Sequence, residues 1–421
     1  MTNGLGLGDA YDATIGRIKA QKGDRARLGM VALMWISHSE RPLKVDEICH
    51  ALAVDLGSTR VNTKNAPSIR TVLGCCQGLA NIDEGSSTIR LVHFTLKEYL
   101  SGHAELFDRP HSKIAETCLT YLNFQAVKDL LASPTSDNRN TPFLRYSPLS
   151  LTNIPMEFVD CSRCPWASPI SDHQGTSFLR YSSLYWGTHM RMELSDRSRY
   201  LALDLLDKYD NHISARLLWE STIEQCLDVR KPFSALHCVS YFGIAEVAID
   251  LISTKGCDVN ERDGEGLTPL MWAAKYGHEE VVKLLLQQKH TQPDMLDTQH
   301  GRTALSWAAG NGNEGVVRLF LSLLFADPGR VGRIWGIPQV MSALFRGKSV
   351  NPDSLDNYGR TPLWRAARNG HDGVMKLLLE RGDVNPDMLD NESRTPLLWA
   401  IWGGHYGIVW NSEATVGTGR C

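Results

Sequence analysis

The sequence Gly266-Leu-Thr-Pro-Leu-Met-Trp-Ala-Ala-Lys-Tyr-Gly-His278 is one copy of a motif that recurs through the C-terminal half of this 421-residue chain. Further copies begin at Gly301, Gly359 and Arg394, and a weaker one begins with Ser234-Ala-Leu-His237. The anchor residues of the five copies are spaced by 34, 35, 58 and 34 positions: Ser234, Thr268, Thr303, Thr361 and Thr395. Self-similarity at this period predicts a solenoid of stacked repeats.

One copy indicates what each repeat should form. Thr268 and Pro269 suit the start of a helix, because a hydroxyl caps free N–H groups and proline is tolerated in the first turn. Gly277 suits its end, where a left-handed residue is favoured. Residues 281–286 predict a second helix with an apolar face. Each helix pair is too small to bury its own apolar face, so the stacking of units creates the core.

The motif resembles the ankyrin repeat, whose consensus Thr-Pro-Leu-His-x-Ala is matched at four anchors. The resemblance covers residues 232–410 and implies a C-terminal ankyrin-repeat solenoid of about five repeats. The consensus histidine is present only as His237, and the other repeats replace it with Met271, Ser306, Trp364 and Leu398. In the family this histidine ties neighbouring loops together by hydrogen bonds, so its replacement implies weaker ties between repeats.

Two segments depart from the repeat. The 58-residue interval implies an insertion near residues 327–350, which is either a loop extruded from the array or a gene-model artefact such as a retained intron. After Val409 the chain continues into an irregular tail, residues 411–421, where an apolar helix is expected. A stack ending in this way lacks a polar capping helix, so we expect the natural array to be longer than this chain.

Residues 11–101 predict a small α+β domain. The sequence predicts helices at 11–20, 25–37, 45–54, 67–78 and 95–100. It predicts the two strands of a β-hairpin at 79–83 and 89–94. Thr95 is expected to cap the last helix. Helices followed by a hairpin make a winged-helix shape, which either binds DNA or serves as a structural joint. Residues 68–77 carry Arg70 as their only cation, so we expect no nucleic-acid partner.

Residues 102–230 predict a helical segment that an exposed loop interrupts. The loop, residues 133–177, is rich in Ser, Pro and Asn. Helices at 178–192, 198–209 and 215–227 are expected to dock on the first repeat and cap it. The whole chain is therefore predicted to be mainly α-helical, with a winged-helix-like α+β domain, a helical linker region and a repeat solenoid in that order.

Three stretches of the first domain, Leu33–His38, Arg41–Val54 and Leu91–Leu100, resemble the winged-helix segment that follows the NACHT nucleotide-binding domain in fungal NLR-like proteins. Residues 111–124 and 178–189 resemble the helical stretch that comes next. The resemblance implies nucleotide-gated oligomerisation and a role in non-self recognition. The chain has no G-x-x-x-x-G-K-S/T phosphate loop, so it is similar to the C-terminal part of such a protein, and we expect no nucleotide cofactor.

The composition excludes several classes of protein. Hydrophobic residues make up 43% and charged residues 22% of the chain, as in an ordinary globular protein. The formal net charge of −3 provides no bulk attraction for nucleic acid or anionic lipid. Ten scattered cysteines, with no long apolar segment and no secretion signal, favour a soluble cytoplasmic protein.

The sequence predicts neither a catalytic nor a metal site. Cys161 and Cys164, with His173 nearby, have metal-ligand spacing, but a structural zinc normally needs a second pair. The G-x-S-x-G and H-E-x-x-H motifs of hydrolases are absent. Six carboxylates recur with the repeat, which indicates that they serve repeat geometry rather than acid–base catalysis. They are Asp294, Asp297, Asp353, Asp356, Asp387 and Asp390.

The candidate binding site is the concave face of the solenoid. Residues that follow the Thr-Pro-Leu corner are expected to point outward from the first helix of each repeat, and many are of the Trp, Tyr and Arg types that dominate interface hot spots. They are Trp272, Lys275, Tyr276, Trp307, Asn311, Arg365, Arg368, Asn369, Trp399 and Trp402. Alternatively, the tryptophans at equivalent positions, Trp272, Trp307 and Trp399, pack between repeats.

These patterns predict a non-catalytic interaction or scaffold protein that binds a protein partner through its ankyrin face, with a possible place in NLR-like signalling. Two alternatives remain open. In the first, the chain is the C-terminal regulatory part of a nucleotide-gated NACHT signalling NTPase. In the second, it binds DNA through its winged helix. The sequence leaves the partner, the trigger and the oligomeric state open.

Overall fold

The computed structural model describes residues 6–60, 66–130, 177–222, 233–322 and 350–405, in two units, Met1–Cys226 and Leu227–Cys421. Both units are mainly helical, as the sequence predicts. Most of the predicted loop at 133–177 and of the insertion at 327–350, together with the tail at 411–421, lies outside the described residues. The same is true of Cys161, Cys164 and His173.

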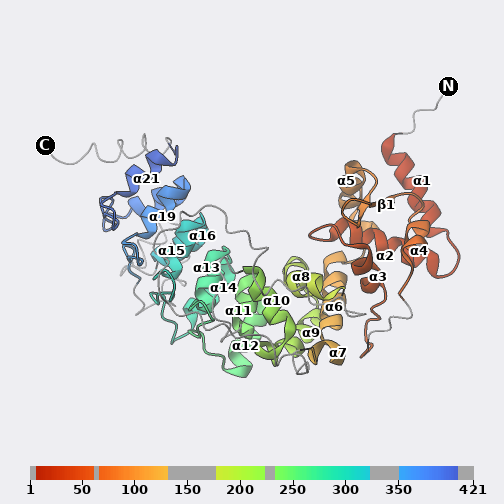
Figure 1. Ribbon diagram of the computed structural model, residues 1–421, viewed down its shortest axis with the longest axis horizontal. Helices are drawn as coiled ribbons and strands as arrows, with labels where there is room; N and C mark the ends of the chain where they lie inside the picture. The colour runs from red at the N-terminus through yellow and green to blue at the C-terminus, as the bar shows by residue number, and fades with distance from the viewer. Residues whose placement is uncertain (1–5, 61–65, 131–176, 223–232, 323–349, 406–421) are drawn as a thin grey trace, which may run out of the picture. The chain divides into compact units, whose positions relative to one another are not determined.

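The first unit begins with the predicted winged helix. Its elements are α1 (Leu7–Lys19), α2 (Asp24–His38), α3 (Val45–Leu52), α4 (Ile69–Cys75), β1 (Ala80–Asp83), β2 (Thr88–Leu91) and α5 (Phe94–Gly102) (Figure 1). The two strands form an antiparallel hairpin with Ile82 opposite Ile89, and Lys44 adds a bridge to Thr88. Each helix contributes apolar side chains to one core, so the helices cover the inner side of the hairpin. Leu33, Ile48, Val72, Ile89 and Leu96 are all buried there.

Helix α5 begins differently from the sequence prediction. His93 rather than Thr95 is the N-cap, and its Nδ1 accepts a hydrogen bond of 3.3 Å from the Thr95 amide. The Thr95 hydroxyl instead lies 2.9 Å from the Tyr11 hydroxyl of α1. Thr95 therefore joins two helices across the domain, a role that local capping rules do not anticipate.

The helical segment of the first unit shares its core with the winged helix. Its elements are η2 (Ala104–Leu106), α6 (Pro110–Leu122), α7 (Gln125–Lys128), α8 (Leu179–Met192), α9 (Asp196–Leu206), η4 (Tyr209–Asn211) and α10 (Ile213–Thr222). Helix α6 packs against α8, α9 and α2. The Trp35 ring of α2 lies edge-on to Phe178 and Tyr181, with centroids 5.6 Å and 6.0 Å apart. These buried aromatic rings join residues that lie more than a hundred positions apart in the sequence.

Helices α2 and α4 approach so closely that only glycine fits where they meet. A Cβ on Gly29 would lie 2.6 Å from the Cys75 carbonyl oxygen and 2.9 Å from Cγ2 of Ile18. Gly29→Ala should therefore destabilise the first unit by about 1–3 kcal/mol through overpacking. The matched control is Gly16→Ala in α1, where an added Cβ meets nothing within 4 Å. That change should stabilise the unit by about 0.5–1 kcal/mol. Hydrogen exchange of the α2 amides measures both effects, and equal protection in the two variants would contradict this packing.

Three histidines from three helices meet in the first unit. Nδ1 of His189 on α8 lies 2.8 Å from Nδ1 of His111 on α6, and Nε2 of His189 lies 2.9 Å from the Tyr181 hydroxyl. The ring of His38 on α2 lies 5.4 Å from that of His111. Burial and the two neighbouring histidines lower the pKa of His189 to about 3. Burial also lowers the pKa of His212 to about 4.

These shifts predict that the first unit loses stability in mild acid. The unfolded chain binds protons at His189 and His212 near the ordinary pKa of 6.5, whereas the folded unit resists protonation until the pH falls much lower. Lowering the pH from 7 to 5 should therefore cost about 2 kcal/mol per histidine. Urea unfolding at several pH values, followed by exchange of the α8 amides, measures the slope. His189→Gln should remove about half of this slope, because His212 still contributes, and an unchanged slope in that variant would contradict the assignment.

The second unit is a row of helix pairs. Its first-helix row consists of α11 (Ala235–Phe242), α13 (Pro269–Lys275), α15 (Ala304–Gly310), α19 (Pro362–Asn369) and α21 (Pro396–Trp402) (Figure 1). Its second-helix row consists of α12 (Ala245–Lys255), α14 (Glu279–Gln287), α16 (Glu314–Ser322) and α20 (Asp372–Leu379). Neighbouring helices of each row pack together, and α15 packs directly on α19. The stack is therefore continuous across the 58-residue interval.

The predicted helix ends of the repeats are confirmed. The Thr268 hydroxyl accepts a hydrogen bond of 3.3 Å from the Met271 amide, and the threonines of the next three repeats do the same. Gly277 has a positive φ of 76° after α13. A Cβ on Gly277 would also lie 2.8 Å from Oδ1 of Asn313 in the next repeat. This glycine therefore both ends a helix and admits the neighbouring repeat.

Hydrogen bonds tie each repeat to the one before it. His237 behaves as its family position implies, with Nε2 3.1 Å from the carbonyl oxygens of Glu261 and Leu267. The other repeats use the residue that follows the helix-ending glycine, which donates to a first-helix carbonyl of the preceding repeat. These bonds are His278 to Tyr241 at 2.8 Å, Asn313 to Ala274 at 2.8 Å, His371 to Gly310 at 3.1 Å and His405 to Arg368 at 3.2 Å. The structure thus supplies ties at a position that the sequence analysis did not consider.

Candidate protein-binding face of the repeats

A buried aspartate sets the position of one large side chain in each of the four repeats anchored by threonine. In the second repeat, Oδ1 of Asp263 accepts hydrogen bonds from the amides of Glu265 and Leu267, and Oδ2 accepts one of 2.7 Å from Nε1 of Trp272. The same indole bond joins Trp307 to Asp297 at 3.1 Å and Trp399 to Asp390 at 3.0 Å. An indole N–H that is buried needs an acceptor, and the turn carboxylate provides it.

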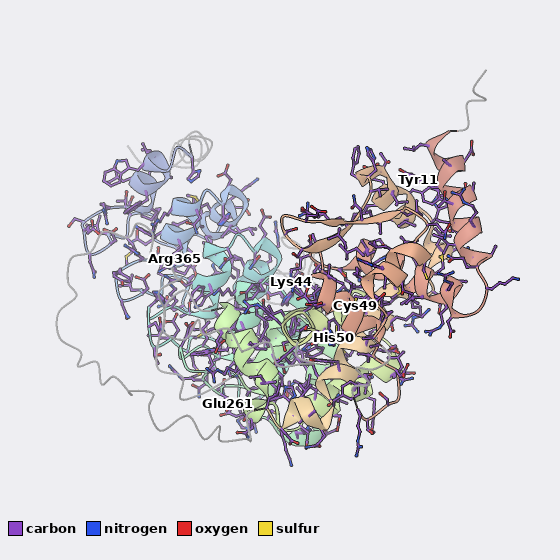
Figure 2. All side chains as sticks on the ribbon, turned by 45° about the vertical axis from the view of Figure 1, so that its right-hand side comes forward. Tyr11, Lys44, Cys49, His50, Glu261 and Arg365 are labelled. Atoms are coloured by element: carbon purple, nitrogen blue, oxygen red, sulfur yellow. The ribbon has the colours of Figure 1, made fainter. Side chains whose placement is uncertain are left out.

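The repeat that contains α19 replaces this tryptophan with arginine. Arg365, labelled in Figure 2, pairs with Asp356, whose other oxygen accepts the amides of Tyr358 and Arg360 at 2.9 Å. The tryptophan of this repeat, Trp364, stands one position earlier in the sequence than the tryptophans of the other repeats. Its Nε1 has no hydrogen-bond partner within the described residues. The geometry of the turn is thus preserved with a cation in place of the indole.

The expectation that all ten candidate residues point outward is wrong for two of them. Trp272 is fully buried at 0% exposure and Arg365 is buried at 9%, because both bind turn carboxylates beneath the surface. For Trp272 the structure supports the alternative that it packs between repeats. Trp307 and Trp399 are half-buried.

The remaining candidates form the accessible part of the first-helix row. Tyr276 is 40% and Trp402 is 65% exposed. Lys275 is half-buried, and the other three are exposed: Asn311, Arg368 and Asn369. Side chains of α13, α15, α19 and α21 therefore share one surface that combines aromatic and cationic groups.

Cations lie over the indole rings along this surface. Nζ of Lys275 is 5.1 Å from the Trp272 ring and 4.8 Å from the Trp307 ring, so one ammonium joins two repeats. The guanidinium of Arg368 is 5.6 Å from the Trp364 ring and 5.3 Å from the Trp399 ring. Within about 6 Å such pairs are attractive, because the ring faces are electronegative.

This surface carries a second set of cations that the sequence predictions did not include. Arginines that directly precede the anchor threonines cover the indoles from the turn side. They are Arg302 over Trp307 at 4.4 Å, Arg360 over Trp364 at 4.4 Å and Arg394 over Trp399 at 4.3 Å. The signal that could have found them is the dipeptide Arg-Thr, which recurs at the anchors of three repeats.

The recurring carboxylates make contacts that join repeats. Asp294 accepts the Asn351 amide of the next repeat at 2.9 Å, and Asp353 accepts the Asn385 amide at 3.0 Å. Burial raises the pKa of both carboxyls, and the amide bonds offset part of that rise. Asp297, Asp356 and Asp390 organise the turns instead. These contacts agree with a geometric role for the recurring aspartates.

Known sequence families match both units. The family described as ankyrin repeats (3 copies) matches residues 235–330 and 335–410. The chain carries ankyrin repeats. Human ankyrin repeat and SAM domain-containing protein 3 is 38% identical to it over 52 residues, which cover 12% of this chain and 8% of that protein. The likeness thus concerns a small part of the relative.

The first unit also has a family match. The winged-helix domain of GPI inositol-deacylase, a domain type associated with NACHT proteins, matches residues 18–109. The first unit therefore carries a winged-helix domain. Among the described helices of the chain, none is both long enough and apolar enough to cross a membrane.

Trp272 and Trp402 differ in burial, so replacing each by alanine should destabilise the repeats to different extents. Trp272→Ala removes a fully buried side chain and leaves Asp263 without its indole donor, so it should destabilise the repeats by about 3–5 kcal/mol. Trp402→Ala removes a side chain that is mostly exposed and should cost less than about 1 kcal/mol. Urea unfolding of the two variants, followed by circular dichroism, measures the difference. Equal destabilisation would contradict this division of the face.

Proposed function

We propose that the chain is a non-catalytic interaction protein whose ankyrin repeats bind a protein partner through the first-helix row. The observation that carries the proposal is the exposed set of Tyr276, Arg368 and Trp402 on a continuous stack of helices. Such residues bury much area at low entropic cost and dominate interface energetics. Because the stack holds them in fixed positions, little ordering is needed when a partner binds.

Site-specific photo-crosslinking tests this proposal. A photoreactive residue placed at Tyr276 or Asn311 should give protein adducts in an extract of the source cells. Matched controls are Ile249 of α12 and Lys376 of α20, which are exposed on the second-helix row. The same adduct band should appear at both first-helix positions and at neither control. Equal adducts from the two rows, or none from Tyr276 and Asn311, would contradict the proposal.

A second candidate function rests on the winged-helix match. The NACHT association of this domain type supports a role as the C-terminal regulatory part of a nucleotide-gated, NLR-like signalling protein. The winged helix and helical segment would then transmit or restrain signals, with the ankyrin repeats as the recognition part. Sequencing the transcript upstream of the Met1 codon tests it. An in-frame phosphate loop would support this function, and a message that starts without one would contradict it.

A DNA-binding role for the winged helix has weak support. Arg70 is exposed and is the only cation of α4. On the hairpin, Arg90 is paired with Asp83 at 2.9 Å, so its charge is already balanced. We therefore propose a structural role for this domain. Affinity for duplex DNA that falls steeply with salt and depends on Arg70 would contradict that view.

A further inference from the structure

Three arginines meet at the C-terminal end of the ankyrin face. Arg368 of α19 lies between the rings of Trp364 and Trp399, at 5.6 Å and 5.3 Å. Arg360 covers Trp364 and Arg394 covers Trp399, at 4.4 Å and 4.3 Å. The Trp402 ring lies 5.5 Å from that of Trp399 and extends the group along α21. These residues form a continuous cation–indole cluster.

The cluster holds more positive than available negative charge. Within the described residues, Arg360 and Arg368 form no ion pair, and the first-helix row contains Lys275, Arg365 and Arg368 but no carboxylate. The acids that contact the cluster are already engaged, and one of them, Glu392, pairs with Arg394 at 2.5 Å. Asp356 binds Arg365 and turn amides, and Asp390 binds Arg394, Trp399 and turn amides.

The guanidinium of Arg368 lies close to two other cations, Arg360 and Arg394. Partial burial of the guanidinium, together with repulsion from Arg360 and Arg394, lowers the pKa of Arg368 from the ordinary arginine value. The guanidinium stays charged at neutral pH because the unperturbed pKa is far above 7. A negative group brought to Arg368 would relieve the repulsion. The site therefore favours an anion over a neutral or cationic partner.

We propose that the cation–indole cluster makes this face selective for an acidic peptide segment of the partner protein, with its carboxylates at Arg360 and Arg368 and an apolar side chain against Trp402. The proposal rests on the proposed function and names the chemistry of the partner. Guanidinium groups bind carboxylates in a planar, two-bond geometry, and the indoles beneath hold them in place.

The charge of the surrounding repeats favours a short acidic peptide over a long polyanion. The second unit, Leu227–Cys421, carries 20 Lys and Arg against 22 Asp and Glu, so it offers a long polyanion no bulk attraction. The cluster adds three guanidinium groups to the first-helix face. A nucleic acid presents one charge at every phosphate and would find few cations to pair with beyond the cluster, whereas a few carboxylates can occupy the cluster alone.

Fluorescence anisotropy with defined probes tests the proposal. The probes are a fluorescein-labelled dodecapeptide of Glu-Glu-Leu repeats, its Lys-Lys-Leu counterpart and a single-stranded DNA of twelve nucleotides. The full chain should bind the acidic peptide saturably, more weakly as salt is raised, and should bind neither other probe with comparable affinity. Arg368→Gln and Arg360→Gln should each weaken acidic-peptide binding at least about fivefold.

A charge-matched control keeps the test specific. Lys376→Gln removes one cation from the exposed side of α20, away from the cluster, and should leave the affinity within about twofold. Circular dichroism melts of each variant exclude loss of folding as the cause. Equal binding of the basic peptide, tighter binding of DNA, or no effect of Arg368→Gln would overturn the inference. If Tyr276 gives crosslinks but the chain shows no preference for the acidic peptide, the proposed function stands and only the selectivity for an acidic segment is contradicted.

Discussion

The buried turn carboxylate is the interaction on which the ankyrin unit depends. One oxygen of Asp263, Asp297, Asp356 or Asp390 holds the amides of its own turn, and the other oxygen holds a side chain of the first helix that follows. That side chain is an indole in three repeats and a guanidinium in the fourth. Each turn is thereby fixed to its helix by a group that would be costly to bury without a partner.

This constraint also creates the candidate binding face. Because the indole N–H points down to the carboxylate, the ring face is left for neighbours above it, and cations occupy that place. Lys275 lies over rings of the second and third repeats, and Arg368 lies over rings of the fourth and fifth, so each cation joins two neighbouring repeats. The stabilising hydrogen bonds and the proposed binding face therefore use different parts of the same side chains.

The repeats and the first unit are held together by different means. Repeats join through short, regularly placed hydrogen bonds, such as those of His278 and Asn313, which lie about one repeat apart in the sequence. The first unit instead relies on residues that are distant in the sequence, such as Trp35 with Phe178 and His111 with His189. Local contacts suit a modular array, whereas the distant ones make the winged helix and helical segment one folded body.

The sequence by itself determined the repeat architecture, its threonine caps and glycine ends, the winged-helix order and the geometric role of the aspartates. These follow from local rules, since a helix cap, a left-handed glycine and a recurring spacing act over a few residues. Only the tertiary structure decided that Trp272 and Arg365 are buried, that Arg302, Arg360 and Arg394 cover the indoles, and that His93 replaces Thr95 as a cap. Equivalent positions in a repeat share a backbone direction, but exposure depends on the carboxylate nine or ten residues earlier and on the neighbouring repeat, which spacing alone does not encode.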